Sequence, residues 1–340
     1  YIPVYRFYSD FPEISLADNI KFRRRTDEDD EIRRLNEHPK FWGEYSALQY
    51  SSQPLILEMK IEFKKPLKSE NYTYVPHFAY DEILKYIDHV YYFFILYASN
   101  FTADTFTFGS FFYLEFPPFI QSYPAERFGF PKYFPYPRSM YSIQTEQRKN
   151  EFQALWQEKS QSFLRYFLNN PQDDIVNLAF ECLIHKWLIR NQDLRVFLLI
   201  STFEGLFFTV NPDKKAKKEI IAENFIKICK NNGKKWQYRK NVLTDADLRN
   251  FIKNSYDVRN NIAHPEEIRP IKRSPKIMFK ASNEPLDDLE LTQFKSTIVA
   301  YFSAFIKFAL EIFFKYRFKN QKEWYDYLKN VNDEYNFRKR

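Results

Sequence analysis

The spacing of apolar residues changes along this chain, and that change limits the folds it can adopt. Before about residue 116, alternating segments such as Leu55 to Phe63 predict strands, whereas from Thr145 to Phe318 apolar residues recur three and four apart, which predicts helices. Between them, Pro117 to Arg138 is crowded with prolines and aromatic residues and predicts an irregular connector. We therefore expect an α+β protein, with a mixed N-terminal domain over 1–140 and a helical bundle over 141–340.

The individual elements follow from the same patterns. In the first half we expect strands at 14–16, 20–22, 55–63, 105–108 and 111–116, and helices over 26–37 and 80–99. In the second half the expected helices span about 145–168, 173–190, 194–210, 214–230, 244–263 and 289–318. No strand is expected beyond Ser142.

The composition is that of a packed protein. Aromatic residues make up 20% of the 340 positions, and the chain has only 5 glycines. Two cysteines cannot build a disulfide framework, which favours a reducing compartment such as the cytoplasm. No apolar run approaches the roughly 20 residues that a membrane-spanning helix needs. We therefore expect a cytoplasmic protein that does not enter a membrane.

Basic residues gather in clusters, although the net charge is only +7. The clusters lie at 23–25, 214–218, 234–240 and 269–280. Such clusters suit the phosphate backbone of nucleic acids. An ordinary solvated surface explains any single cluster equally simply.

Several catalytic motifs are absent from the sequence, including the P-loop, GxGxxG, HExxH and zinc-type spacing of cysteine and histidine. Nucleotide triphosphate hydrolysis and zinc catalysis are therefore disfavoured. Glu58-Met59-Lys60, within an expected strand, resembles the E-x-K end of a metal-dependent nuclease site, but no upstream acidic partner is evident. A charged face on a half-buried strand is the alternative explanation.

The segment from Thr244 to Pro265 carries a more promising combination of side chains. Thr244 and Asp247 have the spacing of a capping box, which predicts the start of an amphipathic helix. Pro265 disfavours helical geometry at His264, so the helix should stop near Ala263 and leave the histidine on a turn. Arg259 falls on the apolar stripe of this helix, where an arginine needs a partner or a function.

Arginine and histidine together suit RNA cleavage. RNA carries its own nucleophile, the 2′-hydroxyl, and histidine is a base that works near neutral pH. The forked guanidinium of arginine matches phosphate oxygens. Five helical positions rotate the side chain by about 140°, so Arg259 and His264 do not share a helix face, whereas Asn260 and Asp257 lie nearer to His264. One copy would then hold half a site, which a two-fold dimer completes.

A purely structural interpretation also fits these residues. Arg259 could be buried and paired with Glu204, which lies on an otherwise apolar helix. His264 could bond the last carbonyls of its own helix. Spacing alone does not decide between the two interpretations.

The run Tyr256-x-x-Arg259-Asn260-x-x-x-His264 resembles the signature of HEPN (higher eukaryotes and prokaryotes nucleotide-binding) domains, in which a histidine follows an arginine by a short interval. Phe197 to Phe207, with Glu204, looks like the helix that carries an "ALExL"-type segment in this family, with Thr202-Phe203 in place of the commoner Ala-Leu. The similarity covers about 145–320 and is nearest to the Apea-like HEPN group. Residues 14–25 loosely resemble what precedes that domain.

This resemblance implies a homodimeric, metal-independent endoribonuclease that needs no cofactor and leaves a 2′,3′-cyclic phosphate. It implies a role in antiphage defence by abortive infection or in a toxin system, with RNA (tRNA or mRNA) as substrate and a phage-derived trigger for activation. The N-terminal domain would sense the trigger or regulate the nuclease. The alternatives are a non-catalytic HEPN module for RNA binding or dimerisation, and a metal-dependent nuclease using Glu58 and Lys60. The expected catalytic residues are Arg259, His264 and Asn260, the supporting ones Glu204, Asp257 and Tyr256, and the RNA-binding ones Lys272, Arg273, Lys276 and Lys280.

Overall fold

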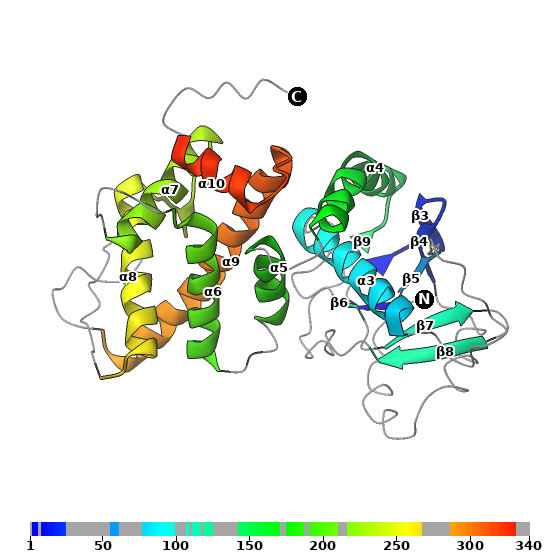
Figure 1. Cartoon of the computed structure of the whole chain (residues 1–340), viewed down its shortest axis with the longest axis horizontal. Helices are drawn as coiled ribbons and strands as arrows, with labels where there is room; N and C mark the ends of the chain where they lie inside the picture. Colours follow the sequence, from blue (N-terminus) through cyan, green and yellow to red (C-terminus); the bar gives the residue numbers. More distant parts are fainter. Residues whose placement is uncertain are drawn as a thin grey trace. The chain divides into compact units, whose positions relative to one another are not determined.

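The computed structural model describes thirteen stretches of the chain, which group into two compact units, Tyr1–Asn169 and Asn170–Arg340 (Figure 1). The described residues are 2–5, 8–24, 55–60, 77–98, 107–108, 111–116, 119–124, 142–170, 175–186, 189, 191–209, 216–266 and 286–330.

The first unit contains a five-stranded antiparallel sheet in the order β3-β4-β5-β1-β6. Its strands are β1 (Ile2–Tyr5), β3 (Glu13–Ala17), β4 (Ile20–Arg24), β5 (Leu55–Met59) and β6 (Thr107–Phe108). Alternation along β3 buries Ile14 and Leu16 and exposes Glu13 and Ser15, as expected for a sheet with one face in the core. Smaller pairs join β2 (Tyr8–Ser9) to β9 (Ser142–Ile143) and β7 (Phe111–Phe116) to β8 (Phe119–Pro124).

Two helices cover the buried face of this sheet, α3 (His77–Tyr97) and α4 (Glu146–Asn169) (Figure 1). The ring of Phe22 on β4 lies 5.3 Å from that of Phe94 on α3 and 5.9 Å from that of Phe152 on α4. Phe93 and Trp156 join the two helices edge to face at 4.7 Å. Aromatic rings bury a large area each, so these contacts hold the sheet and both helices together as one core.

The second unit is a bundle in which α6 is surrounded by the other long helices (Figure 1). Its helices are α5 (Ile175–His185), α6 (Gln192–Phe207), α7 (Lys217–Asn231), α8 (Asp245–Ala263), α9 (Asp288–Lys315) and α10 (Gln321–Asn330). Phe203 on α6 lies 5.2 Å from the ring of Phe225 on α7 and 4.9 Å from that of Phe302 on α9. The apolar spacing along these helices therefore produces a shared aromatic core.

The α+β class is confirmed, but the division of the chain differs from the sequence-based prediction. The units divide at 169/170 rather than at 140/141, because Phe152 and Trp156 place α4 in the core of the first unit. The hairpin strand β8 lies in the segment predicted as an irregular connector. The short strands β10 (Gln237–Tyr238) and β11 (Asn241–Val242) contradict the prediction that no strand follows Ser142, and α10 was not predicted. The predicted helix over 26–37 lies outside the described residues.

Helix α9 is long and apolar enough, by composition, to cross a membrane. Lys295, Lys307 and Glu311 interrupt its sequence, so it contains no uninterrupted apolar run of the length that was expected for a membrane span. Slightly more than half of its most apolar window, 56%, is buried within the protein, and Phe302 and Phe305 contact the rings of Phe203 and Phe251 on neighbouring helices. Burial of this kind fits the core helix of a bundle.

Candidate functional site

Helix α8 begins and ends where its sequence predicts. Thr244 and Asp247 form the reciprocal capping box at its start. The helix ends at Ala263, and His264 is the C-cap residue, with a non-helical φ of −133° and ψ of 72°. The turn at Pro265 thus directs the chain away from the helix directly after the histidine.

Arg259 is half-buried on the face of α8 that meets α6. Its guanidinium carbon lies 4.9 Å from the centre of the Phe197 ring, a cation–π contact. Nη1 donates a hydrogen bond to the side-chain oxygen of Asn260 at 3.3 Å. The buried Nε finds no hydrogen-bond partner among the described residues. A guanidinium has five N–H donors, and among the described residues a single hydrogen bond, to Asn260, uses one of them.

His264 is on the surface, with 60% of its side chain exposed. Its Nδ1 lies 3.5 Å from Oε1 of Glu266, a pair that attracts when the imidazole is protonated. The backbone N–H of His264 donates to the carbonyl oxygen of Asn260 at 2.8 Å. Asn260 therefore contacts Arg259 through its side chain and His264 through its backbone, and it holds both at one end of α8.

Glu204 does not form the ion pair with Arg259 that the structural interpretation proposed. Its carboxylate pairs with the ammonium group of Lys217, which also lies 4.8 Å from the ring of Phe208. Because the Glu204 side chain is only 16% exposed, Lys217 is the cation that compensates its charge inside the protein. Lys217 was not among the predicted site residues, and only the fold brings it to Glu204.

Tyr256 lies in the same contact between α6 and α8. Its side chain is buried, and its hydroxyl approaches the carboxylate of Glu204 but does not reach full hydrogen-bond geometry with any described residue. Burial, followed by the negative charge of Glu204, raises the pKa of Tyr256 far above its ordinary value, while the charge of Arg259 acts in the opposite direction. Tyr256, Glu204 and Arg259 therefore form one electrostatic cluster.

Ser201 adds another buried polar atom to this face of α6. It lies four residues after Phe197 and three before Glu204, so helical spacing places it between the positions that meet Arg259 and Tyr256. Its hydroxyl is also buried and without a partner among the described residues. The spacing could have revealed Ser201 from the sequence, but a serine in an apolar run carries no chemical signal by itself.

Asp257, predicted as a supporting residue, lies in an ion pair between α8 and α7. Its carboxylate pairs with Lys218 on α7 at 2.9 Å. Further ion pairs continue along the same two helices, joining Lys253 to Glu219, Arg249 to Glu223, and Lys230 to Asp245. Asp257 therefore helps to fix α8 against α7, whereas Arg259 faces α6. The predicted RNA-binding residues Lys272, Arg273, Lys276 and Lys280 lie outside the described residues.

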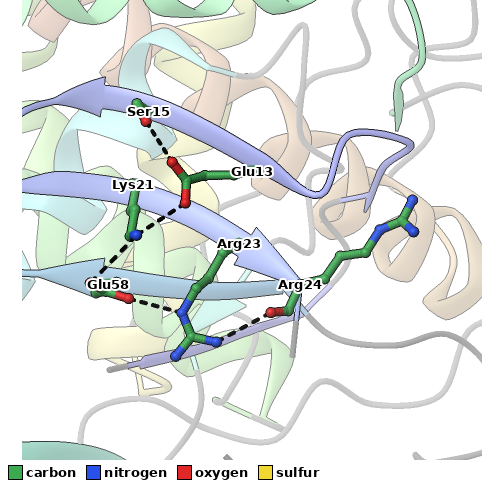
Figure 2. A network of polar contacts seen from close by, with 6 residues as sticks. All are labelled: Glu13, Ser15, Lys21, Arg23, Arg24 and Glu58. Carbon is green, nitrogen blue, oxygen red and sulfur yellow. Dashed lines mark hydrogen bonds and ion pairs between the residues drawn. The ribbon is translucent and has the colours of Figure 1, made fainter. Parts of the chain in front are cut away.

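Glu58 of the E-x-K motif belongs to a network of ion pairs on the face of β3, β4 and β5 (Figure 2). Oε2 of Glu58 accepts a hydrogen bond from Nε of Arg23 at 2.8 Å, and Oε1 lies 3.7 Å from Nζ of Lys21. Lys21 also pairs with Glu13 at 3.0 Å, and this bond lowers the pKa of Glu13. Across the described part of the chain no group of three acidic, histidine or cysteine side chains could hold a metal ion. The geometry of Glu58 is that of a charged strand face, and Lys60 is exposed beyond the end of β5.

Comparison of this chain with protein-family models, with curated proteins and with solved structures finds no match.

Proposed function

We propose that this protein is a metal-independent endoribonuclease of the HEPN type, with Arg259 and His264 as its catalytic residues. The observation that carries the proposal is the arrangement around Asn260. That residue bonds the guanidinium of Arg259 and accepts the amide of His264, so a cation and an exposed imidazole are held at the same end of α8. Among the described residues, Arg259 forms no ion pair with Glu204, which supports the proposal.

The chemistry uses these two groups in different ways. The imidazole of His264 would take the proton from the ribose 2′-hydroxyl, and the 2′-oxygen would then attack the adjacent phosphorus. The bond from phosphorus to the 5′-oxygen breaks, and the departing 5′-oxygen takes up a proton in place of the one that the imidazole removed, which leaves a 2′,3′-cyclic phosphate and a 5′-hydroxyl. Arg259 would stabilise the negative charge that develops on the phosphate oxygens. Both products form without an oxidant, a reductant or a hydrolytic water.

The proposal includes a second copy of the chain, which would complete the active site. Arg259 is directed against Phe197 on α6, whereas His264 leaves the helix and is exposed. One copy therefore presents its imidazole more openly than its guanidinium, and two bundle ends in a two-fold arrangement would surround one phosphate with two sets of these groups. An endoribonuclease of this kind would suit antiphage defence or a toxin system, with tRNA or mRNA as substrate.

The direct test is to incubate the purified protein with total RNA in EDTA and to compare wild type with Arg259→Ala and His264→Ala. We expect wild type to generate 2′,3′-cyclic phosphate and 5′-hydroxyl ends, and both variants to lose cleavage. Removal of a general base typically costs roughly 10²–10⁴-fold in rate.

Arg249→Ala is a matched control, because Arg249 lies on the same helix but pairs with Glu219 and Glu223 of α7. It should cleave RNA at nearly the wild-type rate. Cleavage that persists in both Arg259→Ala and His264→Ala would show that the assigned site is wrong. Wild-type cleavage that EDTA abolishes would favour metal-dependent chemistry, and dimers that bind RNA and leave it intact would favour a non-catalytic module.

A further inference from the structure

The hairpin that joins α7 to α8 carries a concentrated positive charge. Lys234, Lys235, Arg239 and Lys240 fall within seven positions and are all exposed, and no aspartate or glutamate occurs between Asn231 and Thr244. Among the residues that the structure describes, Lys235 and Lys240 form no ion pair. Elsewhere in this bundle, by contrast, basic residues of α7 and α8 pair with acidic ones. Lys235 and Lys240 therefore project positive charge that no acidic group within the hairpin sequence neutralises.

The base of the hairpin is firmly held. Trp236 is buried, and its Nε1–H lies 3.1 Å from the sulfur of Cys229. The hydroxyl of Tyr301 on α9 donates to the carbonyl oxygen of Gln237 at 2.6 Å. The backbone N–H of Leu243 donates to the carbonyl oxygen of Trp236 at 2.9 Å. These contacts fix the direction in which the charged tip projects, so its cations are preorganised rather than spread over many conformations.

The tip adopts a backbone conformation that its residue does not favour. The strand register leaves Arg239 and Lys240 as the two-residue loop, and Arg239 has φ of 55°, in the left-handed region. Glycine is the residue that usually occupies such a loop position in a two-residue hairpin. An arginine that accepts this strain at an exposed tip suggests that its charge is useful there. The Arg239 guanidinium carbon lies 5.7 Å from the ring centre of half-buried Tyr238.

The hairpin and His264 lie at opposite ends of one rigid helix. Helix α8 has 19 residues, which at 1.5 Å per residue separates its two ends by about 28 Å. A strand stacked as in a duplex, with one phosphate per about 3.4 Å along the axis, covers this distance with roughly eight phosphates. A single RNA strand longer than this could contact both ends of α8.

We propose that the β10–β11 hairpin binds the phosphate backbone of single-stranded RNA, one length of α8 away from His264. Basic side chains beside a partly exposed aromatic ring are the features with which proteins hold single strands without reading their sequence. The choice of RNA as the ligand rests on the proposed ribonuclease function. The contact itself concerns binding alone, and it can be tested without cleavage.

The test measures binding of a fluorescently labelled 12-nucleotide RNA by anisotropy at several salt concentrations, with His264→Ala in every protein so that the RNA stays intact. Lys235→Gln/Lys240→Gln is compared with Lys322→Gln/Lys329→Gln, which removes the same charge from exposed positions on α10. We expect the hairpin variant to bind several-fold more weakly. The slope of log affinity against log salt should fall by about 1.4, since each phosphate contact to a single strand contributes about 0.7. Equal affinities and slopes for the two variants would overturn the proposal.

The substitution Arg239→Gly distinguishes an effect of the lost charge on RNA binding from an effect on the stability of the fold. Glycine relieves the left-handed strain, so the melting temperature should stay the same or rise by a few degrees while RNA affinity falls. Unchanged affinity in a correctly folded Arg239→Gly protein would overturn the assignment of the tip. Phosphatidylserine vesicles serve as the comparison ligand. Loss of vesicle binding in the hairpin variant with RNA binding intact would also overturn the proposal, in favour of a membrane contact. A wild type that binds RNA through the hairpin but never cuts it would refute the proposed function and leave this inference standing.

Discussion

Polar side chains are paired in one region of the molecule and largely unpaired in another. The first region is the charged face of β3, β4 and β5, and the second is the contact between α6 and α8. On the sheet, Glu58 has two cations within reach and Lys21 has two carboxylates (Figure 2). Between α6 and α8, the hydroxyls of Ser201 and Tyr256 and Nε of Arg259 are buried, and no described residue bonds any of the three with full hydrogen-bond geometry, although Tyr256 approaches Glu204.

This difference separates charges that stabilise a fold from charges that are available for chemistry. A satisfied surface network contributes little free energy, typically about 0–1 kcal/mol per pair, and leaves nothing for a ligand to bond. Buried polar atoms without partners raise the free energy of the folded state unless water or a ligand bonds them. This contrast supports the proposal that the end of α8 carries the function and that Glu58 has a structural role.

The largest effect should come from Arg259→Lys. This change keeps the positive charge but loses the planar fork that matches phosphate oxygens. We expect the rate of RNA cleavage to fall on the order of 10²-fold, with little change in melting temperature. The measurement is single-turnover cleavage of a labelled RNA. A lysine variant as active as wild type would show that only a charge is needed, and it would weaken the distinction between the two regions.

His89 extends the comparison to a titratable side chain that is packed in the core of the first unit. It stacks on Phe167 at 4.5 Å, and burial followed by the charge of Lys85 lowers its pKa from 6.5 to about 4. Between pH 6.5 and pH 4 the unfolded chain therefore binds a proton at this residue, whereas the folded protein does not. The contribution of His89 to the free energy of unfolding is complete above pH 6.5 and is lost as the pH falls towards 4. We expect a loss of about 2 kcal/mol between pH 7 and pH 5 from this group.

Denaturant unfolding at the two pH values would measure this loss, and His89→Phe is the control that keeps the stacked ring. The variant should lose less stability than wild type between pH 7 and pH 5. Equal losses would mean that His89 is not the group that titrates.

Two neighbouring hydroxyls on α8 give the sharpest test of the unpaired cluster. The Ser255 hydroxyl donates to the carbonyl oxygen of Phe251 at 2.7 Å, whereas the buried Tyr256 hydroxyl has no such partner among the described residues. Ser255→Ala should therefore lower the free energy of unfolding by about 1 kcal/mol. Tyr256→Phe should leave it unchanged or raise it. A loss of 1 kcal/mol or more in Tyr256→Phe would show that Glu204 or water satisfies that hydroxyl.

The smallest effect is expected for Glu58→Gln combined with Lys60→Gln. The side chains of Glu58 and Arg23 are partly accessible, so we expect a loss of less than about 1 kcal/mol in stability. RNA cleavage should continue at the wild-type rate. An inactive double variant that remains folded would return the E-x-K residues to consideration as a catalytic site.

Local signals predicted the parts of the site that depend on neighbouring residues. Thr244 and Asp247 predicted the start of α8. Pro265 predicted its end and the non-helical position of His264. The partner of Glu204 could not be predicted in this way, because Lys217 is thirteen positions further along the chain, on the next helix. The boundary between the two units could not be predicted from local patterns either. The apolar stripe of α4 has the same spacing whether the helix packs on another helix or on a sheet.

The sequence by itself determined the fold class, the bounds of the main helices and the placement of Arg259, Asn260 and His264 at one helix end, because capping, periodicity and proline act over a few residues. Only the tertiary structure decided which charges meet. In the folded protein Glu204 pairs with Lys217, Asp257 pairs with Lys218, and Arg259 packs against Phe197. Electrostatic and packing energies depend on distances between segments far apart in the chain, and a sequence pattern does not contain those distances.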